Sequence, residues 1–163
     1  MQPSLKNTAH SAFGATSPAV PSVEIEVRVM FFDTDCGGVA HNLAYLRFIE
    51  VARVGLAESM GMSLKEMGET RHYPAVIRTE IDYKHPAFLG DSLLVRGWLE
   101  SLERARFWYA FEIVRPVDGQ CLANSRQMLA LVQMPEAKPL RLPGSWREHF
   151  AGKKETDYWQ NGE

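Results

Sequence analysis

Apolar and charged residues alternate strictly near the start of this chain, and that period is typical of a half-buried β-strand. The alternation runs from Val23 to Phe32. Between Asn42 and Ser59 the spacing changes, because apolar residues recur every three or four positions. This second period predicts one long helix, ended by Gly61 as its C-terminal cap. More than half of the helix surface is apolar or small, so we expect a curved sheet around it.

Four further strands are predicted after a short helical turn near Ser63 to Met67. Their apolar rows are Ala75, Ile77, Thr79, Ile81 and Tyr83, then Leu93, Val95 and Leu99, then Phe107, Tyr109, Phe111 and Ile113, and finally a strand from about Leu122 to Met134. Because the connections are too short for parallel crossovers, these strands should form an antiparallel meander. Proline and charged residues end the sheet from Pro135, and a short helix is expected near Ser145 to Phe150.

The length of 163 residues and the hydrophobic content of 45% are sufficient for one domain with its own hydrophobic core. We place that α+β domain at residues 22–136. Residues 1–21 are rich in Ser, Ala, Thr and Pro and should form a disordered tail, without an apolar run long enough for a secretion signal or a membrane span. Residues 137–163 are expected to be a C-terminal extension with a short helix and a polar tail.

Net charge and cysteine content limit the kinds of binding partner and cofactor that the sequence indicates. The net charge of −2 gives no global basic field, so neither nucleic acid nor an anionic membrane is indicated. Cys36 and Cys121 match neither a CxxC pair nor a metal-binding cluster, which favours a reducing cytoplasm and no bound metal. Trp98, Trp108 and Met128 lie on the sheet face opposite the helix and favour self-association as a homodimer or homotetramer.

The segment between the first strand and the long helix carries the candidate chemistry. It places Asp33 and Asp35 before a Gly37-Gly38 bend, with His41 and Asn42 where the helix should begin. Unpaired N–H groups and the positive end of the helix dipole could hold an oxyanion there, so this is a candidate hydrolytic site. Both carboxylates could equally be turn residues that bond nearby backbone. Asn42 is the expected N-cap by residue type.

A family resemblance rests on this segment and its continuation into the helix. Asp-Thr-Asp-x-Gly-Gly-Val, followed by His-Asn-x-x-Tyr-Leu-Arg-Phe-Ile-Glu-x-Ala-Arg, resembles the 4-hydroxybenzoyl-CoA thioesterase branch of the hotdog-fold acyl-CoA thioesterases. The resemblance extends to Tyr83-Lys84-His85-Pro86-Ala87 and covers about residues 23–134. It implies a five-stranded antiparallel sheet wrapped around one long central helix. It also implies dimers joined edge to edge, active sites at the dimer interface, and no cofactor.

The resemblance also implies roles for individual residues. Asp35 would be the catalytic carboxylate, attacking the thioester carbonyl directly or activating a water. The backbone N–H of His41 or Asn42 would hold the oxyanion, and Gly38 would let the chain approach the ligand closely. His41 and Tyr45 would line the substrate site, although His41 could face solvent and Tyr45 could be core packing. Arg104 and Arg106 would meet the CoA phosphates, or form an ordinary solvated turn.

Two other side chains near these positions are weaker candidates. Glu50 is considered because another hotdog branch has its catalytic carboxylate on the long helix, but Arg47 and Arg53 favour a solvated ion-pair stripe. Cys36 next to Asp35 has no evident base and is expected to be a bystander thiol.

The leading function is therefore hydrolysis of acyl-CoA to a carboxylic acid and CoA. One alternative is a dehydratase acting on 3-hydroxyacyl thioesters, which would need His41 and Glu50 in one site although they lie about two and a half helical turns apart. The other alternative is a non-catalytic acyl-CoA-binding module. The sequence leaves several points open: the acyl group, CoA against acyl carrier protein, and a dimer against a tetramer.

Overall fold

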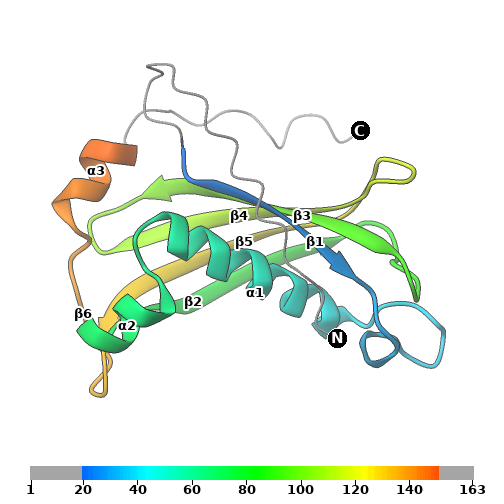
Figure 1. The fold of residues 1–163 in the computed structure, drawn as a ribbon, viewed down its shortest axis with the longest axis horizontal. Helices are drawn as coiled ribbons and strands as arrows, with labels where there is room; N and C mark the ends of the chain where they lie inside the picture. Colours follow the sequence, from blue (N-terminus) through cyan, green and yellow to red (C-terminus); the bar gives the residue numbers. More distant parts are fainter. Residues whose placement is uncertain (1–19, 151–163) are drawn as a thin grey trace, which may run out of the picture.

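The computed structural model describes residues 20–150, with only the backbone of His149 (Figure 1). The elements are, in order, β1 (Ser22–Arg28), the 3-10 helix η1 (Phe31–Asp33), α1 (Asn42–Ser59), α2 (Leu64–Thr70), β2 (His72–Tyr83), β3 (Ser92–Leu102), β4 (Arg106–Arg115), β5 (Gln120–Gln133), β6 (Lys138–Pro139) and α3 (Gly144–Phe150). None of the helices within these residues is long and apolar enough to cross a membrane.

The strands form one sheet in the order β1-β3-β4-β5-β2, and all of its pairings are antiparallel, as the sequence predicted. The predicted four-strand meander is correct only for β3, β4 and β5. Strand β2 pairs with β5 and not with β3, because β1 occupies the other side of β3. The number of elements differs from the prediction. A sixth strand, β6, pairs with the end of β5, because the chain turns back after Pro135 and the Leu140 N–H donates to the Leu131 carbonyl. The predicted architecture of a sheet around one long helix is also incomplete, because the described residues contain two further helices, α2 and α3.

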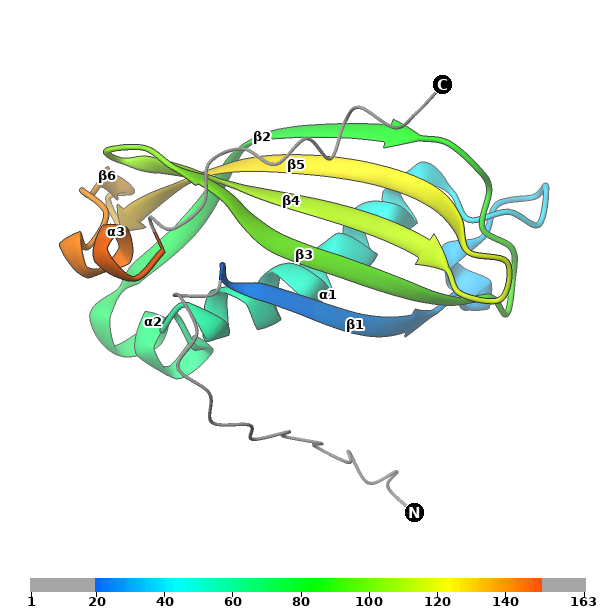
Figure 2. The same cartoon turned by 90° about the horizontal axis from the view of Figure 1, so that it is seen from above.

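Helix α1 has the predicted bounds and lies against one face of the sheet, mainly on β1 and β3 (Figure 2). Its buried side chains recur at helical spacing and are Ala44, Tyr45, Phe48, Ile49, Ala52, Leu56 and Ala57. The helix ends in a Schellman motif, in which the Gly61 N–H bonds the Glu58 carbonyl and the Met62 N–H bonds the Ala57 carbonyl. Gly61 has a φ of 78°, so the predicted glycine stop is confirmed.

The C-terminal part of the described chain packs onto the same core. Trp146 of α3 is only 7% exposed, and its ring meets Phe107 of β4 edge-on with centroids 5.4 Å apart. The Leu142 N–H also donates to the Arg104 carbonyl in the β3–β4 turn. Residues 138–150 therefore cover one end of the sheet, and the expected helix near residues 145–150 is confirmed as α3.

Gly97 in β3 is required by the close approach of a neighbouring ring. A Cβ placed there would lie 2.8 and 2.9 Å from two ring carbons of Phe111, which is itself buried in β4. We therefore expect Gly97→Ala to lower the free energy of unfolding by about 1–3 kcal/mol, the usual penalty for overpacking. Urea denaturation measures this change.

Gly68→Ala in α2 is the matched control, because a Cβ at Gly68 meets nothing within 4 Å. Adding Phe111→Leu to Gly97→Ala should recover part of the loss, since the smaller side chain leaves room for the methyl group. A Gly97→Ala protein as stable as the wild type would contradict the steric argument.

Candidate active site

Asp35 lies in a narrow loop between η1 and α1. The loop is closed by a bridge between Thr34 and Ala40, in which the Asp35 N–H donates to the Val39 carbonyl at 2.9 Å. The His41 N–H donates to the Asp33 carbonyl at 2.9 Å and completes this pairing. Asp35 is consequently held by the backbone at the tip of the loop, where it is exposed to solvent.

The tip is a tight turn built on two glycines. Oδ1 of Asp35 accepts the Gly37 N–H at 2.8 Å, and the Asp35 carbonyl accepts the Gly38 N–H at 3.0 Å. Gly38 has a φ of 75°, a conformation that disfavours other residues. Asp35 thus bonds nearby backbone, as one of the two alternatives predicted, but it does so only through Oδ1. Oδ2 has no hydrogen-bond partner among the described residues, so it is available to chemistry.

The start of α1 supplies backbone N–H groups that could donate to an oxyanion. His41, not the expected Asn42, is the N-cap, and its Nδ1 accepts the Ala44 N–H at 3.1 Å. The reason is the hydrogen bond from His41 to Asp33, which keeps His41 extended and makes Asn42 the first helical residue. The His41 N–H is therefore occupied. The N–H groups of Asn42 and Leu43 bond no acceptor within residues 20–150 and remain open for an oxyanion.

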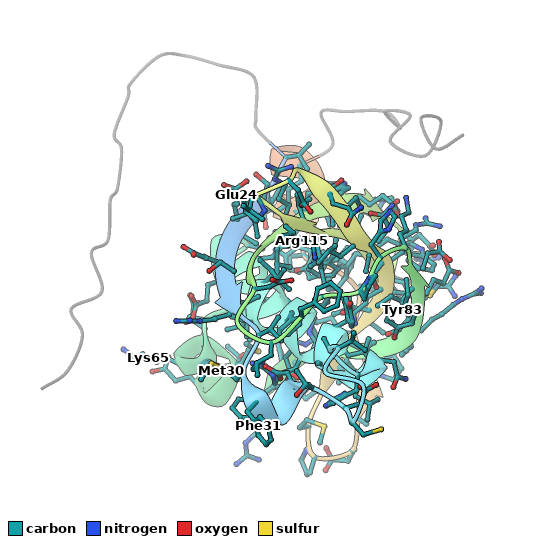
Figure 3. The ribbon with its side chains drawn as sticks, turned by 90° about the vertical axis from the view of Figure 1, so that its right-hand side faces the viewer. Glu24, Met30, Phe31, Lys65, Tyr83 and Arg115 are labelled. Carbon is teal, nitrogen blue, oxygen red and sulfur yellow. The ribbon has the colours of Figure 1, made fainter. Side chains whose placement is uncertain are left out.

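An open hollow of about 320 Å³ adjoins this helix start. It is lined by Ala40, Asn42, Tyr45, Tyr83, Lys84, His85 and Pro86. The loop after β2 is joined to the Asp35 loop by the Ala40 N–H, which donates to the Ala87 carbonyl at 2.8 Å. Figure 3 views the molecule from this end, with Tyr83 on one side and Met30 and Phe31 on the other.

Tyr45 has both of its hydrogen-bonding capacities used by the protein. Its hydroxyl accepts the Ala87 N–H at 2.9 Å and donates to the His85 carbonyl at 3.3 Å. Burial raises the pKa of Tyr45 above its ordinary value. These contacts favour the packing interpretation of Tyr45, which fixes the loop after β2 on α1 and borders the hollow with its side chain.

Asp33 and Asp35 occupy different environments. Asp33 is only 1% exposed and binds Arg47 of α1 through both carboxylate oxygens at 2.6–2.9 Å. Its Oδ2 also accepts the Met30 N–H. Asp33 thus has a structural role, which agrees with the alternative of a carboxylate that bonds nearby backbone. Sequence reasoning missed Arg47 as its partner, because residues 14 positions apart across a loop share no helical or strand period.

Arg104 and Arg106 are not brought together with Asp35 in this chain. They lie at the β3–β4 turn, where Arg106 pairs with Glu103 at 2.8 Å. Strand β4 carries the chain from there to the end that holds the α1 start (Figure 2), about 30 Å away for ten residues. The sequence could have predicted this separation, because successive turns of a meander lie at opposite ends of the sheet.

Of the two weaker candidates, Glu50 is separate from the Asp35 loop and Cys36 lies within it. Glu50 is 63% exposed and pairs with Arg53 at 3.4 Å, as the ion-pair interpretation predicted. Arg47, which was expected in the same solvated stripe, binds the buried Asp33 instead. Glu50 lies nine residues from His41 along the helix, or about 13 Å. Cys36 is an exposed free thiol. Within residues 20–150, no group of three His, Cys, Asp or Glu side chains is placed to hold a metal ion.

This curled antiparallel sheet, with a carboxylate loop at the start of its longest helix, is the architecture of a thioesterase. The chain belongs to the thioesterase-like superfamily, whose family model matches residues 29–152. The resemblance to hotdog-fold acyl-CoA thioesterases is thereby confirmed.

Individual relatives agree with this assignment. The chain is 29% identical over 125 residues to the acyl-CoA thioesterase YbgC of Haemophilus influenzae, covering 76% of this chain and 90% of that protein. It is 28% identical over 123 residues to the 1,4-dihydroxy-2-naphthoyl-CoA hydrolase of Synechocystis, covering 75% and 89%. A solved 1,4-dihydroxy-2-naphthoyl-CoA thioesterase from Synechocystis superposes with a TM-score of 0.70 at 26% identity, covering 80% of this chain and 96% of that one.

Proposed function

We propose that this protein is an acyl-CoA thioesterase that releases a carboxylic acid and CoA, with Asp35 as its catalytic carboxylate. One observation carries the proposal: a carboxylate oxygen without a partner among the described residues lies in a backbone-fixed loop, and that loop leads directly into a helix whose first N–H groups are also unpartnered there. Family membership and the names of the relatives support the same activity.

Two routes are compatible with this arrangement. In the first, Asp35 takes a proton from a water while the water oxygen bonds to the thioester carbon. In the second, Asp35 itself bonds to that carbon, expels the CoA thiolate and forms an anhydride, which water then hydrolyses. In both routes the carbonyl electron pair moves onto oxygen during attack, and the Asn42 N–H stabilises the oxyanion. The CoA sulfur leaves as thiolate and is protonated.

The active unit is proposed to be a homodimer or homotetramer with its sites at a subunit interface. The hollow at the start of α1 is open, so one chain covers only part of a substrate placed there. Strand β2 forms one edge of the sheet, and among the described strands only β5 pairs with it. This edge exposes apolar side chains, namely Tyr73, Val76, Ile77 and Tyr83. A long apolar edge favours pairing with a second copy.

A panel of acyl thioesters tests the activity. It contains aromatic and short-, medium- and long-chain aliphatic acyl-CoAs, together with 1,4-dihydroxy-2-naphthoyl-CoA, because that thioester is in the name of the Synechocystis relative and of the solved Synechocystis structure. Loss of the thioester ultraviolet absorbance with equimolar release of acid is the expected result for at least one member. Acyl carrier protein thioesters of the best acyl group then identify the preferred carrier.

The same panel distinguishes the alternatives. Binding of acyl-CoA by calorimetry without turnover across the panel would overturn the hydrolase proposal in favour of a binding module. Formation of an enoyl thioester from a 3-hydroxyacyl-CoA would indicate a dehydratase instead. The distance of about 13 Å along α1 between His41 and Glu50 argues against that second outcome.

A further inference from the structure

The most completely bonded charged pair near the site is Asp33 with Arg47. The Asp33 side chain is 2% exposed, and the Arg47 guanidinium meets it through Nε and Nη2 at 2.6–2.9 Å. Oδ2 also accepts the Met30 N–H at 2.9 Å. A buried carboxylate needs such a set of donors, so this position is fixed by Arg47 and by the backbone together.

Two aromatic rings fix Arg47 in turn. Its guanidinium carbon lies 5.3 Å from the centroid of Phe32, next to Asp33, and 4.8 Å from the centroid of Phe48, in α1. Both distances fall within the range of cation–π contacts. A planar guanidinium can face rings and bind a carboxylate through two nitrogens at the same time, which an ammonium cannot do. Arg47 therefore joins the root of the Asp35 loop to the first turns of α1.

The backbone continues this connection to Asp35. The carbonyl of Asp33, the residue held by Arg47, accepts the His41 N–H, and this hydrogen bond makes Asn42 the first residue of α1. Asp35 follows two residues later, across the bridge from Val39. One side-chain contact thus determines both the position of the proposed catalytic carboxylate and the start of the helix that offers the oxyanion donor.

We propose that Asp33 and Arg47 are positioning residues, which hold Asp35 at a productive distance from the Asn42 N–H without touching the substrate. This inference rests on the proposed thioesterase function. Arg47→Lys keeps the charge but loses the two-nitrogen contact, so the loop should shift relative to α1. Misplacement of a reacting group by about 1 Å can cost up to ~100-fold in rate. We expect kcat to fall at least ~10-fold, while KM changes less than ~3-fold.

Arg126→Lys is the matched control. Arg126 also binds a carboxylate through two nitrogens, with Glu100 at 2.6–2.9 Å, and its guanidinium carbon lies 4.6 Å from the Trp108 ring centroid. It is on the sheet face opposite α1, so its replacement removes a comparable ion pair without involving the loop. We expect its kcat to stay within about twofold of wild type, because Arg126 lies on the sheet face opposite α1.

Hydrogen–deuterium exchange gives a second readout that does not need activity. In Arg47→Lys, the amides of residues 35–41 should exchange faster, while those of β3 and β4 keep their protection. If Arg47→Lys fails to fold, Asp33→Asn is measured in its place, because it keeps the shape of the side chain and removes the charge.

The outcomes separate the two proposals. Loss of kcat with local acceleration of exchange supports the positioning role. Equal kcat values for Arg47→Lys and Arg126→Lys, or unchanged exchange in residues 35–41, would overturn it. If the wild-type protein hydrolyses no member of the panel, the proposed function fails, and the exchange experiment alone then decides whether Asp33 and Arg47 hold the loop.

Discussion

Asp35→Asn is expected to lower kcat for acyl-CoA hydrolysis by at least ~100-fold, the scale of losing an essential acid–base group or nucleophile. Asparagine has nearly the same shape, and its amide oxygen can still accept the Gly37 N–H that Oδ1 accepts now. The loop should therefore keep its conformation, and only the ionised oxygen is lost. Initial rates on the best thioester of the panel, with circular dichroism to verify folding, measure the effect.

Glu69→Gln is a suitable control for this substitution, because Glu69 is an exposed carboxylate in α2 and its ion pair with Lys65 is long, at 3.9 Å. Its rate should equal that of the wild type. An Asp35→Asn protein that hydrolyses the same substrate at the wild-type rate would remove Asp35 from the mechanism, whatever the activity of the family.

Trp146→Ala should produce the largest loss of stability, about 3–5 kcal/mol, because truncating a buried tryptophan leaves a large cavity. Trp146 is nearly fully buried and stacks edge-on against Phe107. For a chain of this size the melting temperature should fall by roughly 10 °C. Thermal unfolding followed by circular dichroism measures it.

This second experiment also decides where the folding unit ends. Trp146→Phe keeps an aromatic ring against Phe107 and should lose much less stability than the alanine variant. Val117→Ala, at a residue that is 88% exposed, should change little. If Trp146→Ala unfolds at the wild-type temperature, residues 138–150 are an appendage rather than part of the core.

The sequence predicted the regular elements well, because their periods are strong. The bounds of α1 agree with the spacing of its apolar residues, and β2 begins only a few residues before the predicted row at Ala75. Strand β6 was missed for a physical reason. It is two residues long and includes Pro139, so it carries neither a period nor a strand composition, and only its pairing with β5 defines it.

The candidate site was predicted in part. The order of Asp33, Asp35 and the two glycines suffices to place a carboxylate before a helix, but the identity of the N-cap depended on the Asp33 carbonyl, a tertiary contact that residue type does not encode. Arg104 and Arg106 carried a plausible charge pattern. Their distance from Asp35 follows from the direction of β4, which a motif alone does not report.

The two cysteines give this protein a single selective attachment point. Cys36 is exposed and adjacent to Asp35, whereas Cys121 is partly buried and its pKa is raised, first of all by that burial. Because the thiolate is the reactive form, a maleimide fluorophore should modify Cys36 first. The unmodified chain thus accepts an optical reporter one residue from Asp35, which would register the arrival of a ligand before any bond is broken.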